Sequence, residues 1–244
     1  MPSKENPPAG ELPSIKRRVW LEKSFGVKGV YRDRNTPADS PADVADDRAA
    51  RQALLDEIAA EVAKCHRCPL YEEATNPVFG VGNPCAELMF IGEGPGAEED
   101  LRGEPFVGRA GQLLTKIIRA MGMQRSDVYI ANVVKHRAPG NRTPTNYEIA
   151  QCHGYLMRQL EIIKPKIICA LGLPAAQTLL KSEKSIGALR GRFYPYPDNP
   201  EIKVMPSYHT AYLLRNPADK GKTWDDMKKI LAELGRPIPK QKQA

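Results

Sequence analysis

Apolar residues along the chain follow two kinds of pattern, which alternate over most of its length. One pattern has helical spacing, with an apolar side chain at every third or fourth position, as in Ala50, Leu54, Ile58 and Val62. The other is a short unbroken apolar run, such as residues 88–91, which is typical of a strand buried on both faces. Alternation of the two patterns predicts a parallel sheet with helices packed on both of its faces.

The predicted elements have the lengths expected of one α/β domain. Strands are expected at residues 88–91, 128–134, 166–171 and 202–205. Helices are expected at residues 47–62, 113–121, 149–163, 175–180 and 224–234. Thr145 with Glu148 fits a capping box at the start of one helix, and Gly122 closes another. The fold class is therefore predicted to be an α/β three-layer sandwich, with a central four-stranded parallel sheet flanked by helices.

Composition divides the chain into three parts. Residues 1–47 carry many prolines and charges but little apolar periodicity, which predicts a flexible N-terminal extension. Residues 48–235 form the predicted globular domain, and residues 236–244, after the helix-stopping Gly235, form a basic C-terminal tail. No segment approaches the roughly 20 apolar residues of a membrane span. Because residues 1–14 also lack the apolar core of a signal peptide, we expect a cytoplasmic protein.

Charge indicates the kind of partner. The chain has 36 lysines and arginines against 29 aspartates and glutamates, a formal net charge of +7. Such an excess favours a polyanionic partner, because neutralised phosphates release counterions when the protein binds. A basic protein that binds no nucleic acid is the alternative at this point. Five cysteines in a cytoplasmic protein are expected to be metal ligands or buried thiols rather than disulfides.

Three polar or glycine positions fall where predicted strands end. Gly92, Asn132 and His209 each lie at or just after such an end. In parallel α/β sheets ligands bind beyond the carboxyl ends of the strands. The glycine-rich run at residues 92–96 also lets backbone amides approach a small polar ligand closely. We therefore expect these positions to converge in one pocket.

A Cys-x-x-Cys pair, Cys65 and Cys68, follows the first predicted helix. This spacing lets two thiolates hold one metal or one corner of a cluster. A redox-active thiol pair is the alternative interpretation.

The run at residues 91–112, read with Cys65, Cys68, Cys152 and the late Ser207-Tyr208-His209, resembles the family 4 (iron-sulfur) uracil-DNA glycosylases. The resemblance covers residues 65–234. It implies a monofunctional enzyme of DNA base-excision repair, a monomer that flips uracil out of DNA. Such an enzyme hydrolyses the N-glycosidic bond and leaves an abasic site. Uracil-containing DNA is then the expected partner.

The resemblance also implies roles for residues of the base pocket. Phe106 matches the aromatic residue on which the flipped base stacks, and Asn132 matches the asparagine that reads the imide edge of uracil. His209 matches the histidine that donates a hydrogen bond to the uracil O2, where negative charge develops. Glu93 is the candidate for orienting water or stabilising the sugar cation, and Glu99 for excluding thymine. The full set expected to bind the base is Gly92, Gly94, Gly96, Glu99 and Phe106.

A second group matches the segments that grip DNA. Ser207 and Tyr208 match the loop that compresses the phosphate backbone. Leu213 is expected to fill the vacated stack as a wedge, with Leu214 as the alternative. Arg109 and Arg215 are expected to hold phosphates.

The cofactor expected from the resemblance is a 4Fe-4S cluster. Cys65, Cys68 and Cys152 match three of the family's four cysteine ligands, and His136 stands where the family has the other cysteine. Histidine ligates iron in some clusters, so three cysteines and His136 form the expected ligand set. The same four residues are also an ordinary structural zinc set, which is the less favoured alternative. A degenerate site without metal is the third.

Two other functions stay open at this point. Thr210 and Ala211 replace the proline and serine that follow the histidine in the family motif. A non-catalytic protein that binds uracil or damaged DNA is therefore one alternative. A nucleic-acid-binding accessory module that keeps only the fold is the other.

Overall fold

The computed structural model describes residues 41–239, with side chains from residue 47 onward. Its strands are β1 (Val81–Gly82), β2 (Leu88–Gly92), β3 (Tyr129–Asn132), β4 (Ile167–Leu171), β5 (Tyr194–Tyr196) and β6 (Asn199–Ser207). Its α-helices are α2 (Pro41–Ala63), α3 (Leu70–Glu73), α4 (Ala97–Arg102), α5 (Arg109–Ala120), α6 (Asn146–Ile163), α7 (Leu173–Leu180), α8 (Ile186–Leu189), α9 (Thr210–Arg215) and α10 (Lys220–Glu233). Single 3-10 turns cover Arg125–Asp127, Pro139–Asn141 and Pro217–Asp219. Most of the predicted extension and half of the predicted basic tail, residues 1–40 and 240–244, lie outside the described residues.

The sheet has the strand order β1-β3-β2-β4-β6-β5. Its four central strands are parallel, which confirms the predicted α/β class and the four predicted parallel strands. The prediction of a four-stranded sheet was wrong in number, because β1 and β5 extend it with antiparallel edge strands. These strands contain two and three residues, too short for an apolar period to show. Pairing with β5 also makes β6 longer than the sequence indicated.

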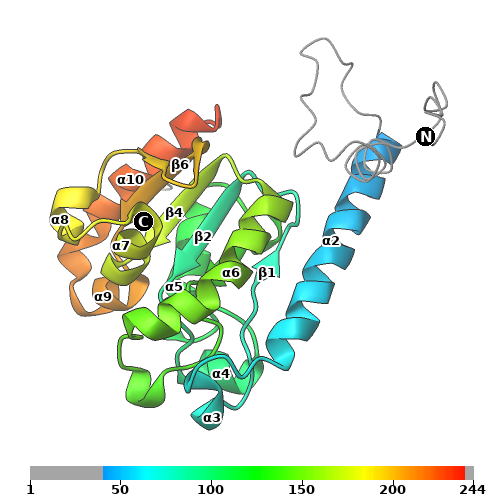
Figure 1. Cartoon of the computed structure of the whole chain (residues 1–244). Helices are drawn as coiled ribbons and strands as arrows, with labels where there is room; N and C mark the ends of the chain where they lie inside the picture. The colour runs from blue at the N-terminus through cyan, green and yellow to red at the C-terminus, as the bar shows by residue number, and fades with distance from the viewer. Residues whose placement is uncertain (1–40, 240–244) are drawn as a thin grey trace. The chain divides into compact units, whose positions relative to one another are not determined.

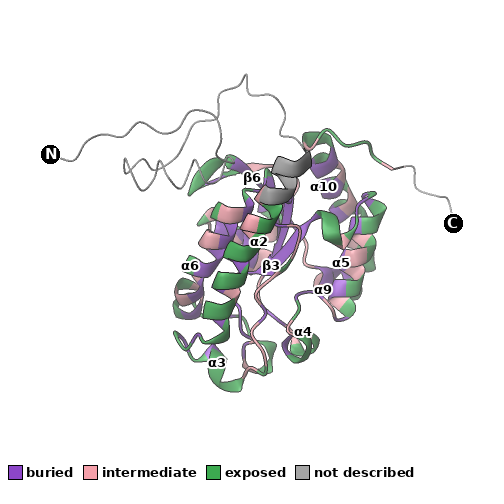
Figure 2. Cartoon of the chain, turned by 90° about the vertical axis from the view of Figure 1, so that its right-hand side faces the viewer, coloured by how far each residue is buried: buried purple, intermediate pink, exposed green. Residues whose placement is uncertain are grey.

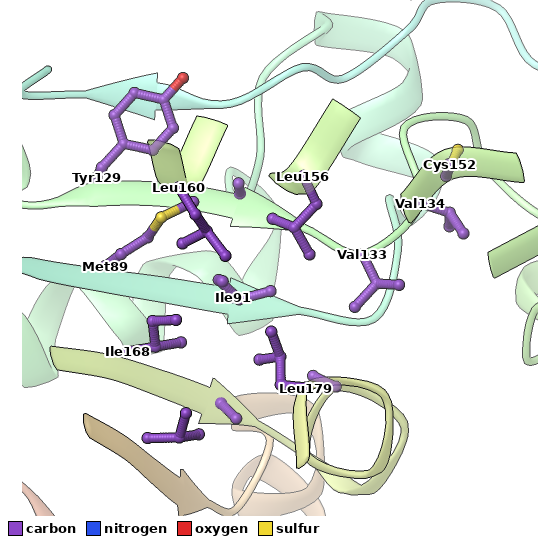
Figure 3. Packing of buried hydrophobic residues seen from close by; sticks show 14 of the residues in the cluster. Met89, Ile91, Tyr129, Val133, Val134, Cys152, Leu156, Leu160, Ile168 and Leu179 are labelled. Carbon is purple, nitrogen blue, oxygen red and sulfur yellow. The ribbon is translucent and has the colours of Figure 1, made fainter. Parts of the chain in front are cut away.

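Two helical layers cover the sheet, as Figure 1 shows. Side chains of α6 and α7 pack with β-strand residues such as Met89, Ile91 and Ile168 on one face (Figure 3). Side chains of α5 and α10 pack on the other face with neighbours such as Phe90 and Met205. The central strands β2, β3 and β4 are buried throughout, whereas the outer surfaces of the helices are exposed (Figure 2). The predicted three-layer sandwich is thus confirmed.

Helix ends follow their local sequence signals. Thr145 accepts a hydrogen bond from the Glu148 amide at 3.3 Å, and the Glu148 carboxylate accepts one from the Thr145 amide at 2.7 Å. This reciprocal capping box begins α6 as predicted. Gly122, with φ of 75°, follows the end of α5 in the left-handed conformation that favours glycine.

The chain divides into two compact units at Ala53 and Leu54, inside α2. This helix begins at Pro41, before the predicted domain boundary at residues 47/48, which stays a prediction. All residues discussed below belong to the second unit. No helix within residues 41–239 combines the length and apolar composition required to cross a membrane.

The strand register sets the position of the site. Gly92 pairs with Asn132 at the ends of β2 and β3, and Leu171 pairs with Ser207 at the ends of β4 and β6. The carboxyl ends of the four parallel strands therefore meet at one edge of the sheet, and the loops that follow them share the space beyond it.

Candidate active site

A cavity of about 520 Å³ lies beyond the carboxyl ends of the parallel strands. Its walls come from the segments that follow β2, β3 and β6, together with the start of α5. The structure thus brings together residues from distant parts of the sequence. The predicted site residues that line it are Glu93, Gly94, Gly96, Glu99, Phe106, Asn132, His209 and Arg215.

Asn132 forms part of the cavity wall at the last position of β3. Asn132 is only 1% exposed, and its Oδ1 has no hydrogen-bond partner among the described residues. Gly92, on the neighbouring strand, leaves the space that the amide uses. A Cβ at Gly92 would lie 2.5 Å from Asn132 Oδ1 and 2.6 Å from Phe106 Cζ. Gly92 therefore keeps the amide and the aromatic ring next to each other without itself lining the cavity.

Phe106 projects from a loop held in an uncommon conformation. Its φ of 54° lies in the left-handed region, which costs a non-glycine residue free energy and needs support from the surrounding structure. Arg125 supplies this support by donating hydrogen bonds to the carbonyls of Pro105 (2.9 Å) and Phe106 (3.2 Å). Gly111 permits the close approach, because a Cβ there would be 1.9 Å from the Phe106 carbonyl group. The aromatic ring is thereby fixed in the cavity wall.

His209 faces Phe106, with 5.7 Å between the ring centroids. It is the residue before α9, and its Nδ1 accepts a hydrogen bond from the Ala211 amide at 3.1 Å. Because Nδ1 accepts, the proton of the neutral imidazole is on Nε2. Burial lowers the pKa of His209 to about 4, and the positive charge of Arg215 acts in the same direction. The cavity thus holds a neutral imidazole that can donate a hydrogen bond.

Glu93 is half-buried in the cavity wall just after β2. Burial raises the pKa of its carboxyl above the ordinary value of 4.5, although a hydrogen bond with Thr143 opposes the shift. Its main-chain carbonyl accepts a hydrogen bond from the Val134 amide at 3.1 Å. The carboxylate is therefore held on a fixed backbone and can act as a hydrogen-bond acceptor or base within the cavity.

Glu99 uses both carboxylate oxygens to join two loops. Oε2 accepts the Gly96 amide at 3.1 Å, and Oε1 accepts the amides of Val107 and Gly108, each at 2.9 Å. The side chain thus connects the glycine-rich turn to the segment that carries Phe106. In this structure Glu99 holds the shape of the cavity wall, and its predicted contact with a base stays a prediction.

The residues expected to contact DNA are divided between surface and core. Arg109 and Arg215 are exposed, and Arg215 also lines the cavity. Tyr208 is half-buried and stacks on Tyr212, with ring centroids 4.9 Å apart. The Arg190 guanidinium lies over the Tyr208 ring, 5.2 Å from its centre.

Two of the residues expected to contact DNA are buried in this structure, and their contact with DNA stays a prediction. Ser207 is fully buried and donates a hydrogen bond to Asp226 Oδ2 at 2.8 Å, so its hydroxyl supports the loop from within. Leu213 is also fully buried, on the inner side of α9 with Thr210. Neither side chain reaches the protein surface in this structure. Leu214, the alternative wedge, is 37% exposed and better placed for that contact.

The expected metal ligands are buried. Cys65, Cys68 and Cys152 are free thiols, and the Cys68 and Cys152 side chains are hydrogen-bonded to each other. The Cys68 sulfur also accepts a hydrogen bond from the backbone amide of Leu70, and the Cys152 sulfur accepts one from the backbone amide of Lys135. Burial raises the pKa of Cys152 to about 11. Burial also raises the pKa of Cys68, so the Cys68 and Cys152 thiols carry a proton until a metal displaces it.

His136 is 6% exposed and follows directly on Lys135, whose amide binds the Cys152 sulfur. Burial lowers the pKa of His136, which leaves its imidazole neutral and able to offer a lone pair to a metal. Within the part of the chain that the structure describes, no three His, Cys, Asp or Glu side chains are grouped so that they could hold a metal ion. The chemistry of the four side chains fits a metal site, and their grouping does not define one.

The sequence analysis missed three residues that support the site. Arg125 stabilises the Phe106 loop, and no local pattern indicated it. Asp226, fully buried on α10, accepts hydrogen bonds from Ser207 and Arg190, both at 2.8 Å. Lys135 is fully buried, and burial lowers its pKa to about 7. A lysine directly after the apolar run at residues 128–134 was the one signal that the sequence offered.

Comparison with known proteins assigns this architecture to a family. A family model described as the uracil DNA glycosylase superfamily matches residues 79–235, which contain the whole sheet. The chain is 43% identical to a type-4 uracil-DNA glycosylase of Archaeoglobus fulgidus over 190 residues, 76% of this chain and 96% of that protein. It is 48% identical to a type-4 uracil-DNA glycosylase of Thermotoga maritima over 167 residues, 68% of this chain and 86% of that protein. For a type-4 uracil-DNA glycosylase of Saccharolobus solfataricus, the identity is 46% over 191 residues, 75% of this chain and 88% of that protein. The resemblance seen in the sequence is confirmed, and the chain belongs to the uracil-DNA glycosylase superfamily, in its type-4 branch.

Proposed function

We propose that this protein removes uracil from DNA by hydrolysing its N-glycosidic bond, which leaves an abasic site in an intact strand. The observation that carries the proposal is the buried, unpartnered Oδ1 of Asn132 in the cavity wall, beside Phe106 and opposite a neutral His209. A buried acceptor without a partner requires a donor from a ligand. The names of the type-4 relatives support uracil as that ligand.

Asn132 and Phe106 account for recognition of the base. The N3–H of uracil can donate to Asn132 Oδ1, while the amide NH2 can donate to the adjacent carbonyl O4. Cytosine presents the opposite pattern at these positions, an acceptor at N3 and a donor at N4. Phe106 offers an aromatic face on which a flipped base can stack. The pocket therefore selects the pairing edge and the flat shape of uracil together.

His209 and Glu93 account for the chemistry. Breaking the bond between C1′ and N1 leaves the bonding electron pair on uracil, spread towards O2, and positive charge on the sugar. The His209 Nε2–H can donate to O2, a type of interaction worth on the order of 100-fold or more in rate. The Glu93 carboxylate can stabilise the sugar cation and orient the attacking water. Water then gives its hydroxyl to C1′ and its proton to the base, and the reaction needs no lysine Schiff base.

The surface around the cavity suits a phosphate backbone. Exposed Arg109 and Arg215 stand at the start of α5 and the end of α9, and each can contact a phosphate. Leu214, exposed on α9, is our choice for the side chain that enters the vacated stack. We propose a monomer as the working form, as the resemblance to the family 4 glycosylases implies. Cellular DNA as substrate supports a cytoplasmic location.

The cofactor that we propose is a 4Fe-4S cluster held by Cys65, Cys68, Cys152 and His136. In such a cluster each ligand binds a different iron, so the four side chains need not converge on one point as they do around zinc. Hydrogen bonds from backbone amides to Cys68 and Cys152 fit thiolate ligands of this kind. The cluster would supply a structural cross-link between the 65–68 turn, α6 and the segment after β3.

A uracil-containing oligonucleotide separates the enzyme from the two alternatives. The purified protein is incubated with the oligonucleotide, and hot alkali then cleaves any abasic site. We expect cleavage at the uracil position only after alkali, and none with a thymine-containing control. Uracil-specific binding without an abasic product would instead indicate a damage-binding protein. Binding that ignores uracil would indicate an accessory module.

A further inference from the structure

Lys135 lies behind Asn132 and is fully buried. Its Nζ donates one hydrogen bond to the main-chain carbonyl of Asn132 at 2.8 Å and another to Gln159 Oε1 at 2.7 Å. Burying a lysine amine costs several kcal/mol unless hydrogen bonds compensate it. An apolar side chain could fill the same volume without this cost. The two acceptors therefore indicate what Lys135 does there.

The main chain of Lys135 is also held by hydrogen bonds. Its carbonyl accepts a hydrogen bond from the Val78 amide at 2.7 Å, and its amide donates to the Cys152 sulfur. Gln159, on α6, is held in turn, because its Nε2 donates to the Phe79 carbonyl at 3.0 Å. The amine is thus fixed relative to α6 and to the chain before β1. It presents a rigid donor to the Asn132 peptide group.

Asn132 needs such a support because its side chain has none. Within the described structure its Oδ1 lacks a hydrogen-bond partner, so the direction of the amide depends on its backbone and on packing. The bond from Lys135 fixes the peptide plane on which that side chain stands. A lysine amine can donate both bonds whether or not it carries its third proton.

We propose that Lys135, oriented by Gln159, is a positioning residue that holds Asn132 in the geometry that reads uracil. This inference rests on the proposed function. A residue that only stabilises the core would affect cleavage whether or not Asn132 is present. The proposed role of Lys135 instead requires that its effect on cleavage depend on the Asn132 side chain. A small displacement of a group that contacts the substrate costs up to about 100-fold in rate.

A double-mutant cycle tests this link. Lys135→Met keeps an unbranched side chain of similar size and removes both donors. With saturating enzyme and uracil-containing duplex, we expect the single-turnover rate to fall about tenfold or more, with an unchanged Kd for the DNA. In an Asn132→Ala background, the same Lys135→Met change should alter the residual rate by less than about twofold. Iron content and the unfolding temperature are measured for every variant.

Two further variants complete the design. Gln159→Met leaves Lys135 one acceptor and should give a smaller loss, again only when Asn132 is present; it replaces Lys135→Met in the cycle if that variant does not fold. Tyr129→Phe is the matched control, because its hydroxyl accepts a longer bond (3.4 Å) from Gln159 Nε2 and makes none with the Oε1 that binds Lys135. Its cleavage rate should equal that of the wild type.

The outcomes separate the two claims. Equal losses in both backgrounds, or no loss with Asn132 intact, would overturn the positioning role while wild-type cleavage leaves the proposed function in place. A wild-type protein that releases no uracil overturns both.

Discussion

Asn132 shows most directly how a single residue reveals a ligand. Leaving a buried acceptor without a partner costs about 1–3 kcal/mol, and most folded proteins avoid it. Asn132 Oδ1 is such an acceptor, and it lies in the wall of a cavity that also contains the Phe106 ring and the His209 imidazole. A bound uracil would offset it by supplying the missing donor. On the proposed function, the site is therefore preorganised for the pairing edge of a base.

Glu93 and His209 lead to a prediction about pH. Burial lowers the pKa of His209 to about 4, so this residue stays neutral throughout the neutral range. Burial raises the pKa of Glu93 above 4.5, so its carboxylate is lost first as the pH falls. We expect the wild-type cleavage rate to decline on the acid side at a pH above 4.5. Glu93→Gln should be slower overall and should lack this decline, measured as single-turnover rates from about pH 4.5 to pH 8.

An acid decline of the same shape in Glu93→Gln would contradict this assignment. It would show that another group, and not Glu93, sets the pH dependence.

Sequence information was most useful at single residues that follow strands. Gly92, Asn132 and His209 could be placed together because parallel strands end at one edge of a sheet. For Leu213 the sequence could not show burial, and its role as the wedge stays a prediction. In a six-residue helix such as α9, apolar spacing does not settle which side faces the core, and the structure buries Leu213 and exposes Leu214.

Strands β2 and β3 place Gly92 against Asn132, which gives a prediction at the level of elements. Gly92→Ala would put a Cβ 2.5 Å from Asn132 Oδ1 and 2.6 Å from the Phe106 ring. The amide and the ring must then move apart. We expect uracil cleavage to fall by about 100-fold or more. Gly221→Ala on α10 is the control, because nothing lies within 4 Å of its Cβ position and activity should be unchanged.

Full activity of Gly92→Ala would mean that the close approach of the two strands does not shape the base pocket. Circular dichroism would establish in parallel that the variant is folded.

The first turn of α6 gives a prediction about stability. Glu148 accepts the Thr145 amide and forms an ion pair with Arg142, with N–O distances of 2.7 and 2.8 Å. This hydrogen bonding, above all with Arg142, lowers the pKa of Glu148 to about 2 from an ordinary 4.5. Its stabilisation is therefore complete above pH 4.5 and is lost as the pH falls towards 2. We expect Glu148→Gln to lower the free energy of unfolding by about 1–2 kcal/mol at pH 7.

Denaturant unfolding of both proteins at several pH values provides the measurement. The difference between them should shrink steadily below pH 4.5. A difference independent of pH would contradict the role of the Glu148 charge.

Elements differed in how well the sequence predicted them. The capping box at Thr145 was correct because its signal is local and complete within four residues. The edge strands β1 and β5 were missed because a strand of two or three residues is defined by its partner and not by its own pattern. The network of Lys135 and Gln159 joins segments far apart in the chain, and only the folded structure could reveal it.

At the scale of the whole molecule, the proposed cluster gives a prediction that spans three segments. If His136 ligates iron beside Cys65, Cys68 and Cys152, then His136→Cys should keep or increase the iron content, because it supplies a thiolate. His136→Ala should lower iron content and unfolding temperature together. Metal analysis and thermal unfolding of anaerobically purified proteins provide the measurements.

Stoichiometric zinc in the wild type would contradict the cluster assignment. Unchanged iron in His136→Ala would contradict His136 as a ligand.

Release of free uracil is the measurement that tests the central claim most directly. The wild type and Asn132→Ala are each mixed in excess with a duplex that carries one uracil, and the released base is quantified over time. We expect the wild type to release the base completely and Asn132→Ala to be at least about 100-fold slower, with the folded state retained. A wild-type protein that binds the duplex without releasing uracil, or an Asn132→Ala variant as fast as the wild type, would contradict the account.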